Sequence, residues 1–186
     1  MHLIKIACII FIAWLWQSCS ASRKPTAIPN AAFDIRDLKS SVVIKQKVAA
    51  VGIDVKSIVA DDLVTCAETL IGTPYRYGSA KKENGFDCSG FINFVFNNFK
   101  VSVPRVSSAF TNAGKEVKPA ESKRGDLILF TGSDASSGVV GHMGIVTDNE
   151  RGKFSFIHAS SSKGVIVSTL SNYYIQRFVK VIRIFP

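Results

Sequence analysis

Two short runs of alternating apolar and polar residues, joined by a turn-rich stretch, constrain the fold of this chain more than any other feature. His142 lies in the first run, residues 141–147, and His158 in the second, residues 153–159. This alternation predicts an antiparallel hairpin. If the hairpin is centred on Glu150, the two histidines face each other directly, with Cβ atoms about 5 Å apart. A slip of one residue would move one of them to the other face.

Cys88 lies at the predicted start of a helix. Gly85 breaks the chain, Asp87 is a suitable N-cap, and apolar residues recur at helical spacing from Phe91 to Phe99. The N–H groups and the dipole at a helix start lower the pKa of a thiol from about 8.5 toward neutrality. We therefore expect a thiol that ionises readily.

Each of these three residues also has an ordinary structural interpretation. A lone helical cysteine is more often a buried packing residue, and a histidine in a strand is often only a hydrogen-bonded polar group. The combination of one cysteine at a helix start with two facing histidines instead favours a catalytic set. We predict that Cys88 is the nucleophile, His142 the general base and His158 the residue that orients His142.

The remaining cysteines do not predict disulfides. Cys8 would leave with an N-terminal signal peptide, and Cys19 is a candidate for lipid attachment. Cys66 lies on an apolar helical stripe between Ile58 and Ile71, where it suits a small buried hydrophobic role. The sequence has no Cys-x-x-Cys pair, so we expect no structural zinc site. A Cys–His pair also requires no organic cofactor.

The first 18 residues have the character of a lipoprotein signal peptide. A short basic start precedes an apolar stretch from Ile6 to Trp16, which is shorter than the roughly 20 residues that cross a bilayer. Ser18 then stands directly before Cys19, as at lipoprotein cleavage sites, although Trp16 occupies a position where leucine is usual. We expect Cys19 to carry the lipid, with simple secretion as the alternative.

The segment after Cys19 predicts a membrane-attached tether. Residues 19–33 are rich in small residues and proline, a composition typical of flexible linkers. Residues 34–55 form an N-terminal extension of open role, and residues 56–186 form the folded domain. Because Ser20 replaces the aspartate that favours inner-membrane retention, we expect an outer-membrane location facing the periplasm.

Length and charge limit the classes of function. A chain of 186 residues has room for one catalytic domain of ordinary size. Its net charge of +9 suits an anionic surface such as cell-wall polymer or lipid headgroups, although scattered basic residues can also serve solubility alone. No nucleic-acid motif and no basic run interleaved with aromatic residues is present, so no nucleic-acid partner is expected. The oligomeric state is left open.

The motifs together resemble the NlpC family of papain-like cysteine peptidases, which cut peptides of the bacterial cell wall. The similarity extends from about Ile58 to Phe185. Any one motif is weak evidence, but together and in this order they are specific. They are Gly-Thr-Pro-Tyr-Arg-Tyr-Gly at 72–78, Phe-Asp-Cys-Ser-Gly-Phe at 86–91, Pro-Arg-Val-Ser at 104–107, the strand 124–130, Gly-His-Met-Gly-Ile-Val at 141–146 and Phe-Ile-His-Ala at 156–159.

The resemblance implies a fold and further site residues. The fold would be α+β and papain-like, with the cysteine helix packed against a central antiparallel sheet. Tyr75 would help to bind the oxyanion, and Asp87, Ser89 and Ser107 would hold the free amino end of a cell-wall stem peptide. Ser79 and Phe110 depart from the glycine and glutamine that are frequent in the family, so substrate details near them are open.

The implied reaction is hydrolysis of the γ-D-glutamyl bond to a diamino acid in a peptidoglycan stem, through a thioester. The identity of the diamino acid is left open. One alternative is a related cysteine amidase or acyltransferase, which would use the same residues on another bond. The other is a non-catalytic wall-binding lipoprotein, which would not need Cys88.

Overall fold

The computed structural model describes residues 52–55, 58–150 and 153–186, all within the compact unit Phe33–Pro186. The predicted signal peptide, the tether, Cys19 and most of the predicted extension lie outside these residues. Within the described part, no helix is both long enough and apolar enough to cross a bilayer.

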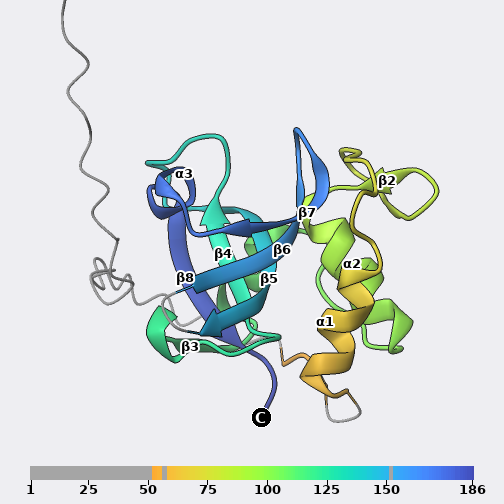
Figure 1. Ribbon diagram of the computed structural model, residues 1–186, viewed down its shortest axis with the longest axis horizontal. Helices are drawn as coiled ribbons and strands as arrows, with labels where there is room; N and C mark the ends of the chain where they lie inside the picture. The colour runs from red at the N-terminus through yellow and green to blue at the C-terminus, as the bar shows by residue number, and fades with distance from the viewer. Residues whose placement is uncertain (1–51, 56–57, 151–152) are drawn as a thin grey trace, which may run out of the picture. The chain divides into compact units, whose positions relative to one another are not determined.

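A six-stranded antiparallel sheet forms the centre of the described chain (Figure 1). Its order is β3-β8-β4-β5-β6-β7. The strands are β3 (Lys115–Val117), β4 (Leu127–Thr131), β5 (Val140–Glu150), β6 (Lys153–Ser160), β7 (Gly164–Thr169) and β8 (Phe178–Arg183). The predicted strands at 126–130, 165–167 and 179–185 correspond to β4, β7 and β8. A small separate sheet pairs β1 (Ala80–Lys81) with β2 (Gly85–Phe86).

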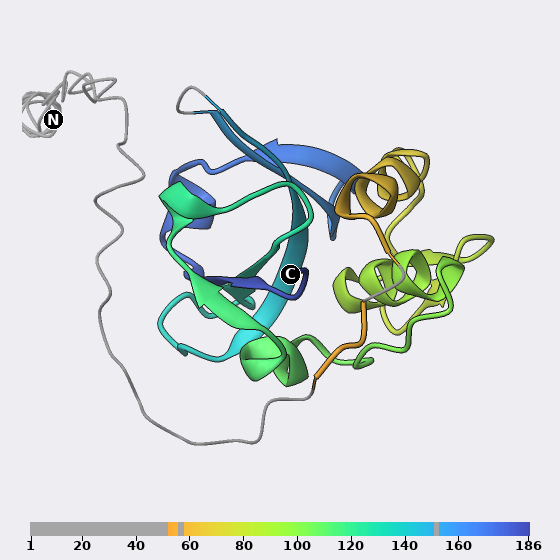
Figure 2. The same ribbon diagram turned by 90° about the horizontal axis from the view of Figure 1, so that it is seen from below.

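Two helices, α1 (Ala60–Glu68) and α2 (Cys88–Asn98), lie side by side along one face of the curved sheet (Figures 1 and 2). The remaining helical turns are short. They are η2 (Ser107–Asn112), η3 (Pro119–Glu121) and α3 (Asn172–Ile175). The apolar side of α2 is fully buried, and Leu129 and Ile145 of the sheet belong to the same core. This burial of apolar side chains, rather than helix propensity, holds α2 against the sheet.

A second core lies on the opposite face of the sheet. Strand β4 is buried at all five positions, so its side chains alternate between the two cores. Leu127 and Leu129 point into the core shared with the helices, whereas Ile128 and Phe130 point into the second core. The side chains of Phe156 and Tyr174 complete the second core near the end of the sheet that carries the histidines.

The predicted hairpin forms, but its predicted register is wrong. Glu150 pairs with Lys153, and the ladder continues to Asp148 opposite Ser155. Val146 then pairs with Phe156, which leaves Thr147 as an extra residue on β5. Such a bulge adds one residue to one strand only.

The two histidines are therefore diagonal neighbours rather than directly opposite residues. Since Ile145 pairs with Ile157, the next position along the ladder places Gly144 beside His158. His142 lies two residues further along β5 and pairs with Phe130 of β4 on its other side. The shift of two residues keeps both histidines on one face, as predicted, because side chains alternate with a period of two.

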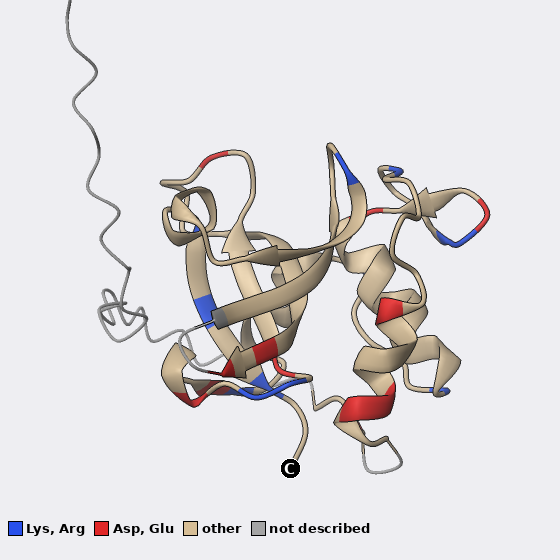
Figure 3. Ribbon diagram, in the orientation of Figure 1, with Lys and Arg blue, Asp and Glu red and all other residues tan. Residues whose placement is uncertain are grey.

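The charged residues are distributed unevenly over the described elements (Figure 3). Acidic residues lie in the first turn of α1, where Asp61 pairs with Arg124, and Arg124 also binds Glu68. The same guanidinium donates a hydrogen bond to the carbonyl oxygen of Thr147 at 3.0 Å. This contact ties the bulge of β5 to α1.

Candidate active site

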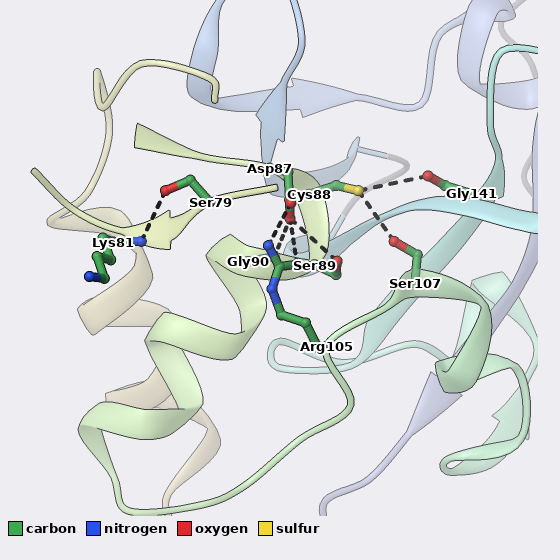
Figure 4. A network of polar contacts seen from close by, with 9 residues as sticks. All are labelled: Ser79, Lys81, Asp87, Cys88, Ser89, Gly90, Arg105, Ser107 and Gly141. Atoms are coloured by element: carbon green, nitrogen blue, oxygen red, sulfur yellow. Dashed lines mark hydrogen bonds and ion pairs between the residues drawn. The ribbon is translucent and has the colours of Figure 1, made fainter. Parts of the chain in front are cut away.

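Cys88 is the first residue of α2, and the N-cap before it fixes its position. Asp87 has an extended backbone, and its carboxylate accepts a hydrogen bond from Gly90 N at 2.6 Å. The sulfur points away from Asp87, toward Ser107 and Gly141 (Figure 4). Cys88 Sγ lies 3.2 Å from Ser107 Oγ, and the thiol donates to the carbonyl oxygen of Gly141 at 3.7 Å. The resting side chain is thus held between a hydroxyl and a carbonyl.

Burial raises the pKa of the Cys88 thiol, although hydrogen bonds from Ser107 and from the backbone N–H groups of Ser89 and Cys88 act in the opposite direction. The nearby charge of Asp87 raises it further. The sequence predicted a lowered pKa because it revealed the helix start but not the depth of burial, and Cys88 is only 9% exposed. The resting group is therefore a protonated thiol at neutral pH.

His142 and His158 bind each other directly. His142 Nε2 lies 2.9 Å from His158 Nδ1, with the two rings nearly perpendicular at 86°. The close approach requires a glycine at Gly144, since a Cβ there would lie 3.1 Å from the His158 Cβ and 2.8 Å from the carbonyl oxygen of Ile157. The pair that the sequence predicted is present, with a different register.

Burial lowers the pKa of both histidines. The pKa of His142 falls from 6.5 to about 4, and desolvation is the cause. The pKa of His158 falls to about 3, mainly through burial and additionally through the charge that His142 would carry. Both imidazoles are therefore neutral in the resting protein, and each then has one ring nitrogen that accepts a hydrogen bond.

Two hydroxyl groups contact the far side of His158. Its Nε2 lies 3.0 Å from Ser168 Oγ on β7 and 3.1 Å from Tyr174 OH on α3. The sequence did not reveal these partners. Ser168 becomes visible only once β7 is paired with β6, in the register that places Phe156 opposite Ser168.

A polar cluster surrounds the carboxylate of Asp87. Arg105 donates from Nη1 to Asp87 Oδ1 at 2.9 Å and from Nη2 to Oδ2 at 2.7 Å. Arg105 also donates to Ser89 Oγ at 3.1 Å. The structure thus brings together Asp87 and Ser89, whereas Ser107 contacts the sulfur of Cys88 instead. Arg105 lies within the quoted Pro-Arg-Val-Ser motif, so its presence was visible in the sequence but its partner was not.

A cavity of about 950 Å³ has Cys88, His142, His158 and Tyr75 in its wall. The pKa of Tyr75 is raised by burial and by the nearby charges of Cys88 and Asp87. Among the described contacts, no hydrogen bond joins Cys88 to His142; the thiol binds the carbonyl of Gly141, the residue before His142. Catalytic hydrogen bonds are often long before substrate binds.

The described residues also bear on the predicted burial of Cys66 and on metal binding. Cys66 is partly exposed on α1 rather than buried, which corrects the predicted packing role. Among the described residues, no group of three or more His, Cys, Asp or Glu side chains could hold a metal ion.

The sequence model of the NlpC/P60 family matches residues 72–183, more than half of the chain. The chain therefore belongs to the NlpC/P60 family. Murein DD-endopeptidase MepS/Murein LD-carboxypeptidase of Escherichia coli K12 is 30% identical over 169 residues, covering 89% of this chain and 83% of the relative. Probable endopeptidase NlpC of the same strain is 38% identical over 107 residues, covering 57% of this chain. That alignment spans 65% of the length of the relative. A separate alignment with Probable peptidoglycan endopeptidase LytE of Bacillus subtilis spans 32% of the length of that protein.

Solved structures confirm the predicted fold class, α+β with a papain-like arrangement and an antiparallel sheet. An NlpC/P60 family protein of Bacillus cereus superposes with a TM-score of 0.61 at 27% identity, covering 69% of this chain and 41% of that protein. The peptidoglycan hydrolase RipB of Mycobacterium tuberculosis superposes with a TM-score of 0.54 at 29% identity, covering 68% and 65%.

Proposed function

We propose that this protein is a peptidoglycan hydrolase, a cysteine endopeptidase that cleaves the γ-D-glutamyl bond to a diamino acid in cell-wall stem peptides. One observation carries the proposal: the cavity wall contains both the thiol of Cys88 and two neutral histidines that are hydrogen-bonded to each other. Family membership and the printed names of the relatives support peptidoglycan as the substrate.

In the proposed mechanism each imidazole carries its proton on one particular ring nitrogen. If His142 Nδ1 takes the thiol proton, Nε2 of His142 must carry hydrogen and donate to Nδ1 of His158. The proton of His158 is then on Nε2, where Ser168 and Tyr174 offer hydroxyl oxygens as acceptors. His158 thus orients His142 and stabilises its charged form, the role of the acid residue in a serine triad.

The reaction then proceeds as acyl transfer. The Cys88 thiolate attacks the amide carbonyl, a thioester forms, and protonated His142 gives its proton to the leaving amine. Water, deprotonated by His142, hydrolyses the thioester and frees the thiol. We assign the backbone N–H of Cys88 and the hydroxyl of Tyr75 to the oxyanion; losing one such donor typically costs about 10²–10³ in rate.

We propose, from the family resemblance, that Asp87, Ser89 and Ser107 hold the free amino end of the acyl half of the substrate. The contacts of Asp87 add a condition, because both of its oxygens already bind Arg105. An incoming ammonium group must share this carboxylate with the guanidinium, as carboxylate oxygens with two lone pairs each allow. Arg105 would then fix the orientation of Asp87 during binding.

We further propose a lipid anchor at Cys19 and an outer-membrane location facing the periplasm. The support is the Ser18–Cys19 pair after an apolar stretch, together with the tether composition of residues 19–33. The anchor would hold the enzyme near its substrate, the peptidoglycan layer.

Mass spectrometry of defined muropeptides after incubation with the purified protein tests the proposed reaction. We expect products cut between γ-D-glutamate and the diamino acid. Cys88→Ala should abolish them, whereas the control Cys66→Ser should leave the rate within about twofold, because Cys66 is partly exposed and outside the cavity wall. Products cut at another bond would indicate the related amidase or acyltransferase. Wall binding without any Cys88-dependent product would indicate the non-catalytic alternative.

A further inference from the structure

The cavity beside Cys88 has a distinct electrostatic character. Of the described residues that line it, two are cationic, Lys163 and Arg177, and none is acidic. Many of the others are serine, threonine or tyrosine, so the wall is rich in hydroxyl groups. Lys163 is exposed on the turn between β6 and β7, and Figure 3 shows the tip of this connection as basic. Such a surface attracts an anionic group.

Arg177 is held in place by its surroundings. Its guanidinium carbon lies 3.9 Å from the centre of the Tyr173 ring, and Nη1 donates to the carbonyl oxygen of Tyr173 at 3.2 Å. Stacking on an aromatic ring and one backbone hydrogen bond fix the plane of the guanidinium. A ligand would therefore meet a pre-oriented donor group.

Arg177 also has donors that the described protein does not use. Three arginines in the described chain are half-buried, and two of them bind carboxylates: Arg124 binds Asp61 and Glu68, and Arg183 binds Asp126. Arg177 has no carboxylate partner among the described residues, and its buried Nε atom has no hydrogen-bond partner there.

A second buried polar atom in the same wall lacks a partner. Thr131 is only 3% exposed, it lines the cavity, and its Oγ1 makes no hydrogen bond within the described chain. The backbone N–H of Thr131 donates a hydrogen bond to the carbonyl oxygen of Arg177 at 2.8 Å, so the two residues lie side by side. Unpaired buried polar groups are uncommon in folded proteins. Two of them lie beside this cavity, so the protein itself does not satisfy every polar group of the wall.

The two sides of Cys88 differ in charge. Asp87 and its cluster lie on one side of the sulfur, and Gly141 lies on the other (Figure 4). The cavity wall includes Gly141 and Arg177 but not Asp87. If the amino end of the acyl half lies toward Asp87, as proposed above, the leaving half extends toward Arg177.

We propose that this cavity binds a free carboxylate on the leaving half of the substrate, with Arg177 as its main partner and Lys163 at the rim. The inference rests on the proposed function and deepens it by naming the substrate class. The preferred stem peptides carry an unmodified carboxylate on the diamino acid residue, and peptides with that carboxylate amidated bind poorly. A cavity of about 950 Å³ has room for such a residue.

Binding to the Cys88→Ala variant tests this proposal without turnover. The probes are three γ-D-glutamyl-diamino acid peptides: one with free carboxylates, one amidated on the diamino acid and one amidated on the glutamate α-carboxylate. Calorimetry should give an affinity about 10-fold or more lower for the peptide amidated on the diamino acid, since a charge-assisted hydrogen bond is lost.

Arg177→Gln in the same background should remove this difference by weakening only the binding of peptides with a free diamino acid carboxylate. The matched control is Lys115→Gln, which removes one positive charge on β3, at the opposite edge of the sheet from β7. The Lys115→Gln variant should still bind the free-carboxylate peptide more tightly than the peptide amidated on the diamino acid. Arg177→Lys keeps the charge without the planar fork and should fall between the two.

Three results would overturn the proposal. They are equal affinities for the three peptides in the Cys88→Ala protein, a difference confined to the peptide amidated on glutamate, or no measurable binding. Failure of the proposed function gives a different result. In that case the wild-type protein, with Cys88 intact, binds the free-carboxylate peptide but does not cleave it at the γ-glutamyl bond. The comparison of free and amidated peptides needs no substitution at Arg177, so it stands even if that variant does not fold.

Discussion

The buried histidine pair should make the stability of this protein unusually sensitive to mild acid. In the folded protein the pKa of His142 is about 4 and that of His158 about 3, whereas an ordinary histidine has a pKa of 6.5. Below pH 6.5 the two histidines bind protons in the unfolded chain but stay unprotonated in the folded protein. Since the unfolded state binds more protons in this window, the free energy of unfolding falls as pH falls, down to about 4 for His142.

The size of the effect follows from linkage. One proton bound only by the unfolded state costs about 1.4 kcal/mol per pH unit. Between pH 7 and pH 5 about one and a half units fall within the window, so each histidine removes about 2 kcal/mol of stability. The pair together removes about 4 kcal/mol, a large part of the roughly 5–15 kcal/mol of a typical domain.

Urea denaturation at pH 7 and pH 5 measures this loss in the wild type and in His142→Gln. Glutamine retains a side-chain N–H that can donate to His158 Nδ1, but it does not titrate. The wild type should lose about 2 kcal/mol more than the variant between the two pH values, and His158→Gln should behave similarly. Contributions from carboxylates cancel in the comparison. Equal losses in wild type and both variants would refute the assignment of two buried, neutral imidazoles.

Two further predictions concern the proposed catalytic pair and the proposed lipid anchor. His158→Asn should retain more peptidase activity than His158→Ala, because the asparagine oxygen can accept the hydrogen bond from His142 Nε2 and alanine cannot; equal steady-state rates for the two folded variants would remove His158 from the orienting role. In envelope preparations the mature protein should begin at Cys19 with the added mass of acyl chains and partition into detergent, and an intact mass showing an unmodified residue 19 would contradict the anchor.

The sequence predicted those features that depend on local pattern. Short sequence spacings determine the N-cap at Asp87, the apolar face from Phe91 to Phe96 and the strand alternation around the histidines. The structure contains all three features. The papain-like fold followed from the order of the motifs rather than from any one of them.

Features that depend on long-range pairing were not predictable in the same way. The partners Ser168 and Tyr174 come from β7 and α3, and nothing in their own sequence marks them as contacts of His158. The pKa of Cys88 was predicted in the wrong direction, because a helix start is local but burial is decided by the packing of η2 and β5 around it. Counting residues from the turn gave the wrong hairpin register, because the sequence does not reveal that β5 contains a bulge.

The bulge at Thr147 means that the number of residues between the two histidines is not what brings them together. A two-residue connection between Glu150 and Lys153, without a bulge, demands an odd sum of paired residue numbers, and two even-numbered histidines would then project from opposite faces. Thr147 absorbs the odd residue, and its carbonyl is held by Arg124 while its hydroxyl binds Ser155 Oγ at 2.8 Å.

Related chains can therefore gain or lose one residue in this hairpin without separating their imidazoles, provided that a bulge appears or disappears with it. A sequence pattern with a fixed interval of 16 residues between the histidines would miss such chains, although their active sites would be the same.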